Sequence, residues 1–117
     1  MKRMLAWSMI GLGAAHIGFG VLRFKVALLE AFQSGFIGQF YEPERRVAFW
    51  FLIVGPMLVL IGHLALRGIA SGDPHILKII GYYGLVIAAV GILAFPKSPL
   101  WLLLALSIAM LTVSYKQ

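Results

Sequence analysis

Residues 47–66 have the sequence VAFWFLIVGPMLVLIGHLAL, which contains no Asp, Glu, Lys or Arg. A helix of about twenty apolar residues covers about 30 Å, the thickness of the hydrocarbon core of a bilayer. An amphipathic helix on a soluble core shows a polar stripe at a period of 3.6 residues, and this stretch has no such stripe. The stretch therefore predicts a helix that crosses a membrane.

Three further uncharged stretches of similar length lie at residues 4–22, 79–96 and 98–115. The chain has 117 residues, of which 62% are hydrophobic and only 12% are charged. We expect an all-α integral membrane four-helix bundle that forms one domain over residues 1–117, because the sequence shows no internal repeat and leaves no room for a second domain.

The charged residues lie mainly between these stretches. The formal net charge is +6, which in a soluble domain would suggest a nucleic-acid partner. Here Lys and Arg flank apolar stretches, where they contact anionic lipid headgroups, so membrane lipids are the expected partners and nucleic acid is not. The chain contains no cysteine, which excludes disulfides, thiolate nucleophiles and iron–sulfur clusters.

The start of the chain, Met1-Lys2-Arg3 before an apolar stretch, is also typical of a secretory signal. The stretch is longer than a usual signal and no small-x-small cleavage site follows it, so we expect a membrane helix instead. Four spans would place both termini and residues 67–78 on one side, with five Lys and Arg on each side of the membrane. We expect a bacterial inner membrane with cytoplasmic termini, because Lys2 and Arg3 precede the first span. Insertion in both orientations, as an antiparallel homodimer, is the alternative.

The only long connection, residues 23–46, predicts a short interfacial amphipathic helix between the first two spans. Its apolar row repeats every four residues: Phe24, Leu28, Phe32 and Phe36. Gly35 and Gly38 then interrupt the helix, and Glu42-Pro43-Glu44 is typical of the start of the next one. This segment acts either as an anchor in the headgroup layer or as a lid.

Two turn signals and one row of small residues predict how the later spans pack. Residues 71–74 and 95–99 are rich in Gly, Pro and Ser and predict short reversals. Small residues that let a neighbouring helix approach closely line the third span at Gly81, Gly84, Ala88 and Gly91.

His16 is the ionisable residue that lies deepest in an apolar stretch. Such a residue faces the bundle interior and finds a partner, because an unpaired polar group in hydrocarbon is costly. Gly13 and Gly20 leave space on its face of the helix, and Pro56 at a similar depth frees the carbonyl of Leu52. Two interpretations stay open: a ring hydrogen-bonded to that carbonyl, or a midplane cavity at His16, Gly13, Gly20 and Pro56 that binds a lipid, quinone or other apolar molecule.

His63 lies much nearer the membrane surface than His16, so the two cannot share a haem within one chain. We expect His63 near Trp7, Tyr82 and Tyr83, with a hydrogen bond to a tyrosine.

Other functions lack the residues that they need. Glu30, Glu42 and Glu44 all lie in the long connection, so no carboxylate is placed in hydrocarbon for proton-coupled transport or for an isomerase-like reaction. The Asp73-x-His75 pair is too common to indicate a metal site. No catalytic residue, metal or specific cofactor is assigned. The expected function is binding of an apolar small molecule, and the alternatives are a structural or accessory subunit of a membrane complex or a small dimeric transporter.

The segments Gly13-Ala14-Ala15-His16 and Phe49-Trp50-Phe51-Leu52-Ile53-Val54-Gly55-Pro56 carry a resemblance. The chain resembles a family of small uncharacterised bacterial inner-membrane proteins with four helices. The resemblance covers most of the chain and implies a four-helix bundle with no established activity.

Overall fold

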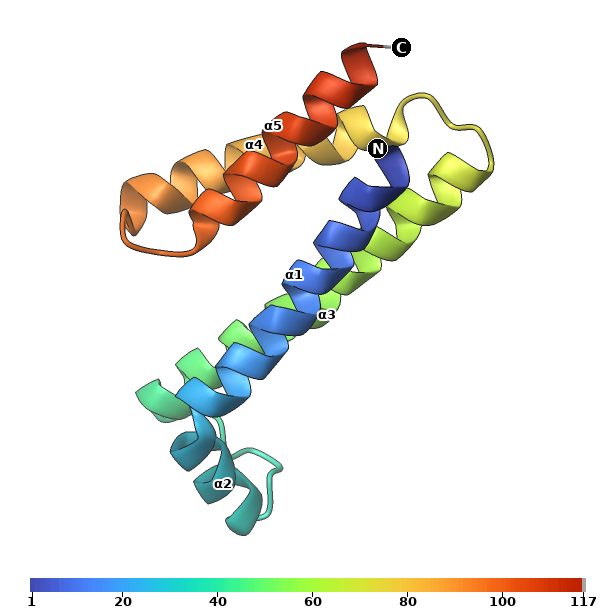
Figure 1. The fold of residues 1–117 in the computed structure, drawn as a ribbon. Coiled ribbons are helices and arrows are strands. Elements are labelled where there is room, and N and C mark those ends of the chain that lie inside the picture. The colour runs from blue at the N-terminus through green and yellow to red at the C-terminus, as the bar shows by residue number, and fades with distance from the viewer. Residues whose placement is uncertain (117) are drawn as a thin grey trace. The chain divides into compact units, whose positions relative to one another are not determined.

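A computed structural model describes residues 1–116 and contains five α-helices in this range, with no strand among them (Figure 1). The helices are α1 (Lys2–Arg23), α2 (Lys25–Gln33), α3 (Pro43–Ala70), α4 (Ile76–Ala94) and α5 (Leu100–Tyr115). Helices α1, α3 and α4 are long and apolar enough to cross a membrane. The chain is therefore an all-α membrane protein. The predicted fourth span is an apolar helix of 16 residues, which is shorter than the other three.

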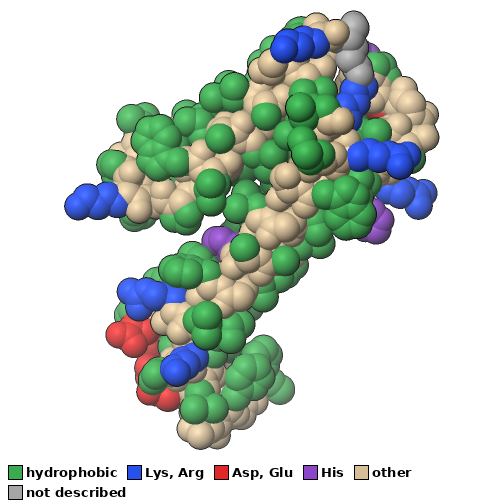
Figure 2. All heavy atoms as spheres, in the orientation of Figure 1, with side chains coloured by type: hydrophobic (Ala, Val, Ile, Leu, Met, Phe, Trp, Pro, Cys, Tyr) green, Lys and Arg blue, Asp and Glu red, His purple; other side chains and the backbone are tan. Residues whose placement is uncertain are grey.

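The surface agrees with a membrane environment. Hydrophobic side chains cover most of the face drawn in Figure 2, whereas the charged side chains gather near helix ends. Large apolar residues such as Leu22, Leu93 and Trp50 are mostly exposed. By contact, the chain divides into two compact units, residues 10–60 in one and residues 1–9 with those from 61 onward in the other. Each unit is described by itself.

In the unit of residues 10–60, α1 and α3 pack antiparallel through glycines. A Cβ built on Gly13 would lie 2.7 Å from the carbonyl oxygen of Gly55, and one built on Gly20 would lie 2.7 Å from Leu52. Later residues of α1 thus meet earlier residues of α3. Gly55 in turn receives the side chain of Ile17. Glycine at these positions lets the two backbones approach closely, as is usual between helices in lipid.

The predicted interfacial helix is α2, but it ends at Gln33, before the predicted apolar row does. Gly35, Phe36 and Gly38 all have positive φ angles, of 100°, 69° and 71°. A left-handed backbone cannot continue an α-helix, so Phe36 lies in the turn that follows α2. The predicted start of the next helix is confirmed, because α3 begins at Pro43 with Glu44 in its first turn.

Arg45 connects α3 to the preceding segment. Its guanidinium lies 3.5 Å from a carboxylate oxygen of Glu30 on α2 and 3.7 Å from one of Glu42. It also donates to the backbone and side-chain oxygens of Gln39, each at 3.4 Å. The Arg45 side chain is only 12% exposed, whereas the side chains of Glu30 and Glu42 are 55% and 69% exposed, so solvent still screens both pairs. They tie α2 to the start of α3.

In the second unit, α4 and α5 form an antiparallel hairpin. A Cβ built on Gly81 would lie 2.8 Å from Leu111, one on Gly84 would meet the Ser107 hydroxyl, and one on Gly91 would meet Leu100. The predicted seam of small residues on this span is therefore confirmed, and its partner is α5. The predicted reversal at residues 95–99 is confirmed as well.

The turn between α3 and α4 lies where the sequence predicts it. Gly72 has a φ of 79°, which glycine adopts without strain. The backbone N–H of His75 donates to the Asp73 carboxylate at 2.8 Å, so this Asp-x-His pair closes a local turn. Gly68 of α3 packs against Ile76 of α4.

Candidate functional site

His16 joins α1 to α3 through two contacts with one residue. Its Nε2 atom lies 2.7 Å from the carbonyl oxygen of Phe51, and its ring stacks on the Phe51 ring at 3.9 Å between centroids and 15° between planes. The histidine therefore has the partner that its depth in the apolar stretch predicts.

The hydrogen bond to Phe51 determines the tautomer of the neutral ring. A carbonyl oxygen only accepts hydrogen bonds, so the Nε2 atom of His16 must carry the proton. In the neutral imidazole the other nitrogen, Nδ1, then has a lone pair and is an acceptor. Within residues 1–116, no side chain or backbone group donates a hydrogen bond to Nδ1.

Aromatic side chains surround this contact. Phe51 also packs against Phe19 and Phe24, with ring centroids 5.9 Å and 5.4 Å apart. His16 is half-buried and Phe19 is 57% exposed, so the cluster lies at the edge of the α1–α3 contact and reaches the outer surface of the pair. The sequence signal for this cluster is the aromatic segment Phe49-Trp50-Phe51, but the sequence does not identify it as the partner of His16.

The four predicted ligand-binding residues occupy different surroundings. Gly13 and Gly20 lie on the same face as His16, and α3 fills the space beside both of them. Pro56 lies on the exposed side of α3. The structure thus brings His16, Gly13 and Gly20 together against α3 and leaves Pro56 outside that contact. Binding of a molecule there stays a prediction.

The carbonyl that accepts the hydrogen bond from His16 belongs to Phe51, whereas the sequence argument favoured Leu52. A proline removes the donor for the carbonyl four residues earlier, which identifies Leu52 as the free acceptor. Which carbonyl reaches the imidazole depends on how α3 is rotated toward α1, and the sequence alone does not define that rotation.

His63 lies beside Trp7, as predicted, but its expected hydrogen bond to a tyrosine is wrong for residues 1–116. The hydroxyl of Tyr82 bonds that of Tyr115 instead, at the open end of the α4–α5 hairpin. His63 lines a shallow hollow of about 330 Å³ that also includes Arg3 and Arg67.

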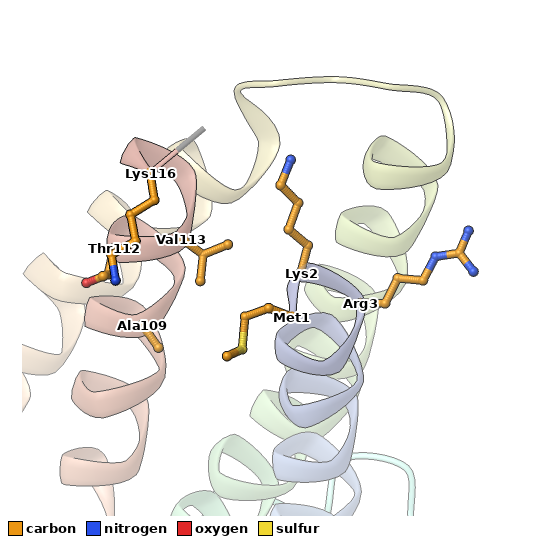
Figure 3. Close-up of a pocket in the computed structure, with 7 residues that line it drawn as sticks. All are labelled: Met1, Lys2, Arg3, Ala109, Thr112, Val113 and Lys116. Atoms are coloured by element: carbon orange, nitrogen blue, oxygen red, sulfur yellow. The ribbon is translucent and has the colours of Figure 1, made fainter.

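A larger hollow of about 830 Å³ lies between the start of α1 and the end of α5 (Figure 3). Its lining residues are Met1, Lys2, Arg3, Ala109, Thr112, Val113 and Lys116. The sequence does not predict this hollow. Its signal in the sequence is the presence of cations near both ends of the chain, Lys2 and Arg3 at one and Lys116 at the other. In the range 1–116, no three His, Asp or Glu residues lie close enough to hold a metal ion.

These features define a small all-α membrane protein in which a histidine joins two helices and cations surround a hollow at the chain ends. A family model covers residues 1–117, and the chain belongs to that family, DUF6463, a family of unknown function. The chain matches no curated protein and no solved structure.

Proposed function

We propose that this protein binds a lipid-class small molecule that carries a hydroxyl group, at the outer edge of His16. The observation that supports this proposal is the hydrogen bond from Nε2 to the Phe51 carbonyl, because it leaves Nδ1 as an acceptor. An acceptor without a donor is costly in hydrocarbon, and a hydroxyl satisfies it. A hydroquinone, a sterol or a long-chain alcohol fits this requirement, whereas the carbonyl of an oxidised quinone does not.

We also propose that α5 is a fourth span. Its 16 residues cover about 24 Å, somewhat less than the hydrocarbon core. It lies antiparallel against α4 along most of its length, so a chain that crosses with α4 returns with α5. Trp101 and Tyr115 lie at its two ends, where aromatic residues mark the membrane interfaces. Helix α2 then lies in the interface, with both termini on the cytoplasmic side of a bacterial inner membrane.

Two substitutions at one position separate ligand binding from helix packing. In His16→Gln the amide nitrogen can still donate to the Phe51 carbonyl, but the remaining acceptor, the amide oxygen, is displaced from the position of Nδ1. In His16→Ala both are lost. We expect mass spectrometry of gently purified protein to show at least tenfold less bound small molecule in both variants. We expect His16→Gln to keep more of the wild-type thermal stability than His16→Ala, because it retains the hydrogen bond to Phe51 and loses only the ring stacking.

The matched control is His63→Gln, which changes an exposed histidine of α3 that does not contact Phe51. It should retain the small molecule at the wild-type level. The proposal fails if the wild type carries no hydroxyl-bearing molecule, or if His16→Gln retains as much of it as the wild type does.

A second candidate function, an accessory subunit or homodimer, is favoured by the other face of α1. Apart from the adjacent residues and backbone of α1 itself, no atom lies within 4 Å of the positions that a Cβ would take at Gly11 and Gly18, and Ala14 and Ala15 beside them are exposed. A face of small residues accepts another transmembrane helix at close range.

We expect Gly18→Leu to abolish such an association, because a bulky side chain prevents close approach of the backbones. Light scattering of the protein in detergent, coupled to size exclusion, should show a multimer or a mixed complex for the wild type and a monomer for the variant. Met57→Leu, at an exposed position of α3, is the control. A wild type that is monomeric and free of other proteins would exclude this candidate.

A further inference from the structure

We propose that the hollow between the start of α1 and the end of α5, here called the terminal groove, binds an anionic phospholipid from the leaflet on the side of the chain ends. This site is separate from His16 and does not depend on the function proposed for it.

The lining of the terminal groove changes from charged to apolar along its length. Lys2 and Lys116 lie at the ends of their helices, whereas Ala109 lies seven residues before Lys116, about 10 Å deeper at 1.5 Å per residue. Between these levels the side chains of Met1 and Val113 extend toward each other from the two helices (Figure 3). An amphipathic molecule matches this order, with its phosphate near the lysines and an acyl chain along Val113 and Ala109.

The charged residues around the terminal groove are almost all cations. Arg3 lines both the terminal groove and the adjacent hollow, which adds Arg67. A further cation lies nearby: the Nζ atom of Lys78 is 4.3 Å from the centroid of the Tyr115 ring, and Tyr115 directly precedes Lys116. Asp73 is the one acidic residue in the described part of this unit, and its carboxylate accepts the N–H of His75. The groove cations therefore lack carboxylate partners within residues 1–116 and are available to a phosphate.

The cations in the connection of residues 23–46 differ from those of the terminal groove, because two of them have partners within the protein. Arg45 is paired with Glu30 and Glu42, and Arg46 donates to the backbone oxygen of Tyr41 at 2.6 Å. That connection carries three acids for its four Lys and Arg, so its net charge is small. Attraction of an anionic headgroup, which grows with each unpaired Lys or Arg near the surface, favours the terminal groove.

The test is native mass spectrometry of the protein in detergent with equal amounts of phosphatidylglycerol and phosphatidylcholine. We expect the wild type to retain the anionic lipid preferentially. The double variant Lys2→Gln with Lys116→Gln should retain about 25-fold less of it, at about fivefold for each lysine removed. The double variant Lys25→Gln with Lys97→Gln removes the same charge elsewhere and should match the wild type. Equal retention by the two double variants would overturn the proposal.

A second variant tests the apolar part of the groove with all cations in place. Ala109→Phe fills the groove and should release phosphatidylglycerol, whereas Leu102→Phe, at an exposed position of the same helix, should not. Circular dichroism would verify that both variants keep the wild-type helix content. Displacement of the lipid by 20 mM inorganic phosphate would overturn the proposal, because the site would then bind a free anion. Retention of the lipid by His16→Gln would distinguish this site from the one at His16.

Discussion

The Gly13→Ala substitution is expected to lower the free energy of unfolding by about 2–3 kcal/mol, the upper part of the range for overpacked sites. The added Cβ would lie 2.7 Å from the carbonyl oxygen of Gly55 and 2.8 Å from the backbone nitrogen of Val59. Both are backbone atoms, so no side-chain rotation relieves the overlap and α1 must move away from α3. Titration of the detergent-solubilised protein with a denaturing detergent, followed by circular dichroism, measures this loss.

Gly11→Ala and Gly18→Ala are the matched controls, because they make the same change in the same helix where no atom lies within 4 Å of the new Cβ. Alanine favours a helix over glycine by about 1 kcal/mol, so each control should be as stable as the wild type or slightly more stable. If Gly13→Ala unfolded at the same concentration of denaturing detergent as these two variants, α1 and α3 would not pack through Gly13 and Gly55.

The positions of the helices follow from the sequence because hydrophobicity and turn chemistry act locally. The start of α3 at Pro43 and the reversals at residues 71–74 and 95–99 were predicted from a few neighbouring residues each. The end of α2 was predicted only approximately: Gly35 and Gly38 indicate the interruption, but the apolar row continues through Phe36, where the backbone is already left-handed. A repeat in side-chain type does not determine where the backbone leaves the helix.

The candidate site was predicted less completely because its geometry depends on how two helices are rotated. The need of His16 for a partner could be predicted, since it follows from the cost of a lone polar group in hydrocarbon. The identity of that partner, Phe51 rather than Leu52, depends on which face of α3 meets α1. The same rotation leaves Pro56 exposed and places Gly55 against α1. Adjacent residues on a helix point about 100° apart, so the rotation of α3 decides which of two neighbouring residues faces α1.

The terminal groove shows a different limit. Its cations are visible at both ends of the sequence, but the groove forms between residues more than a hundred positions apart. No local pattern indicates how close those ends lie. The charge of a membrane-facing site can thus be predicted from its residues, whereas its shape requires the packing of distant helices.

Gly84→Ala is expected to destabilise the α4–α5 hairpin by about 2 kcal/mol, because the new Cβ would overlap the Ser107 hydroxyl in the buried contact between the helices. Removing that hydroxyl should restore most of the loss. Within residues 1–116 the Ser107 Oγ atom has no hydrogen-bond partner, so Ser107→Ala alone should cost little.

A double-mutant cycle over Gly84→Ala and Ser107→Ala measures this compensation directly. We expect a coupling of at least 1 kcal/mol, incomplete because the new Cβ still lies 3.3 Å from the Cβ of residue 107 and the helices must yield by a few tenths of an ångström. Strictly additive effects would show that the two residues do not touch. Coupling of this size would establish that α5 packs on the small-residue seam of α4, which is the contact from which we infer that the chain crosses the membrane a fourth time.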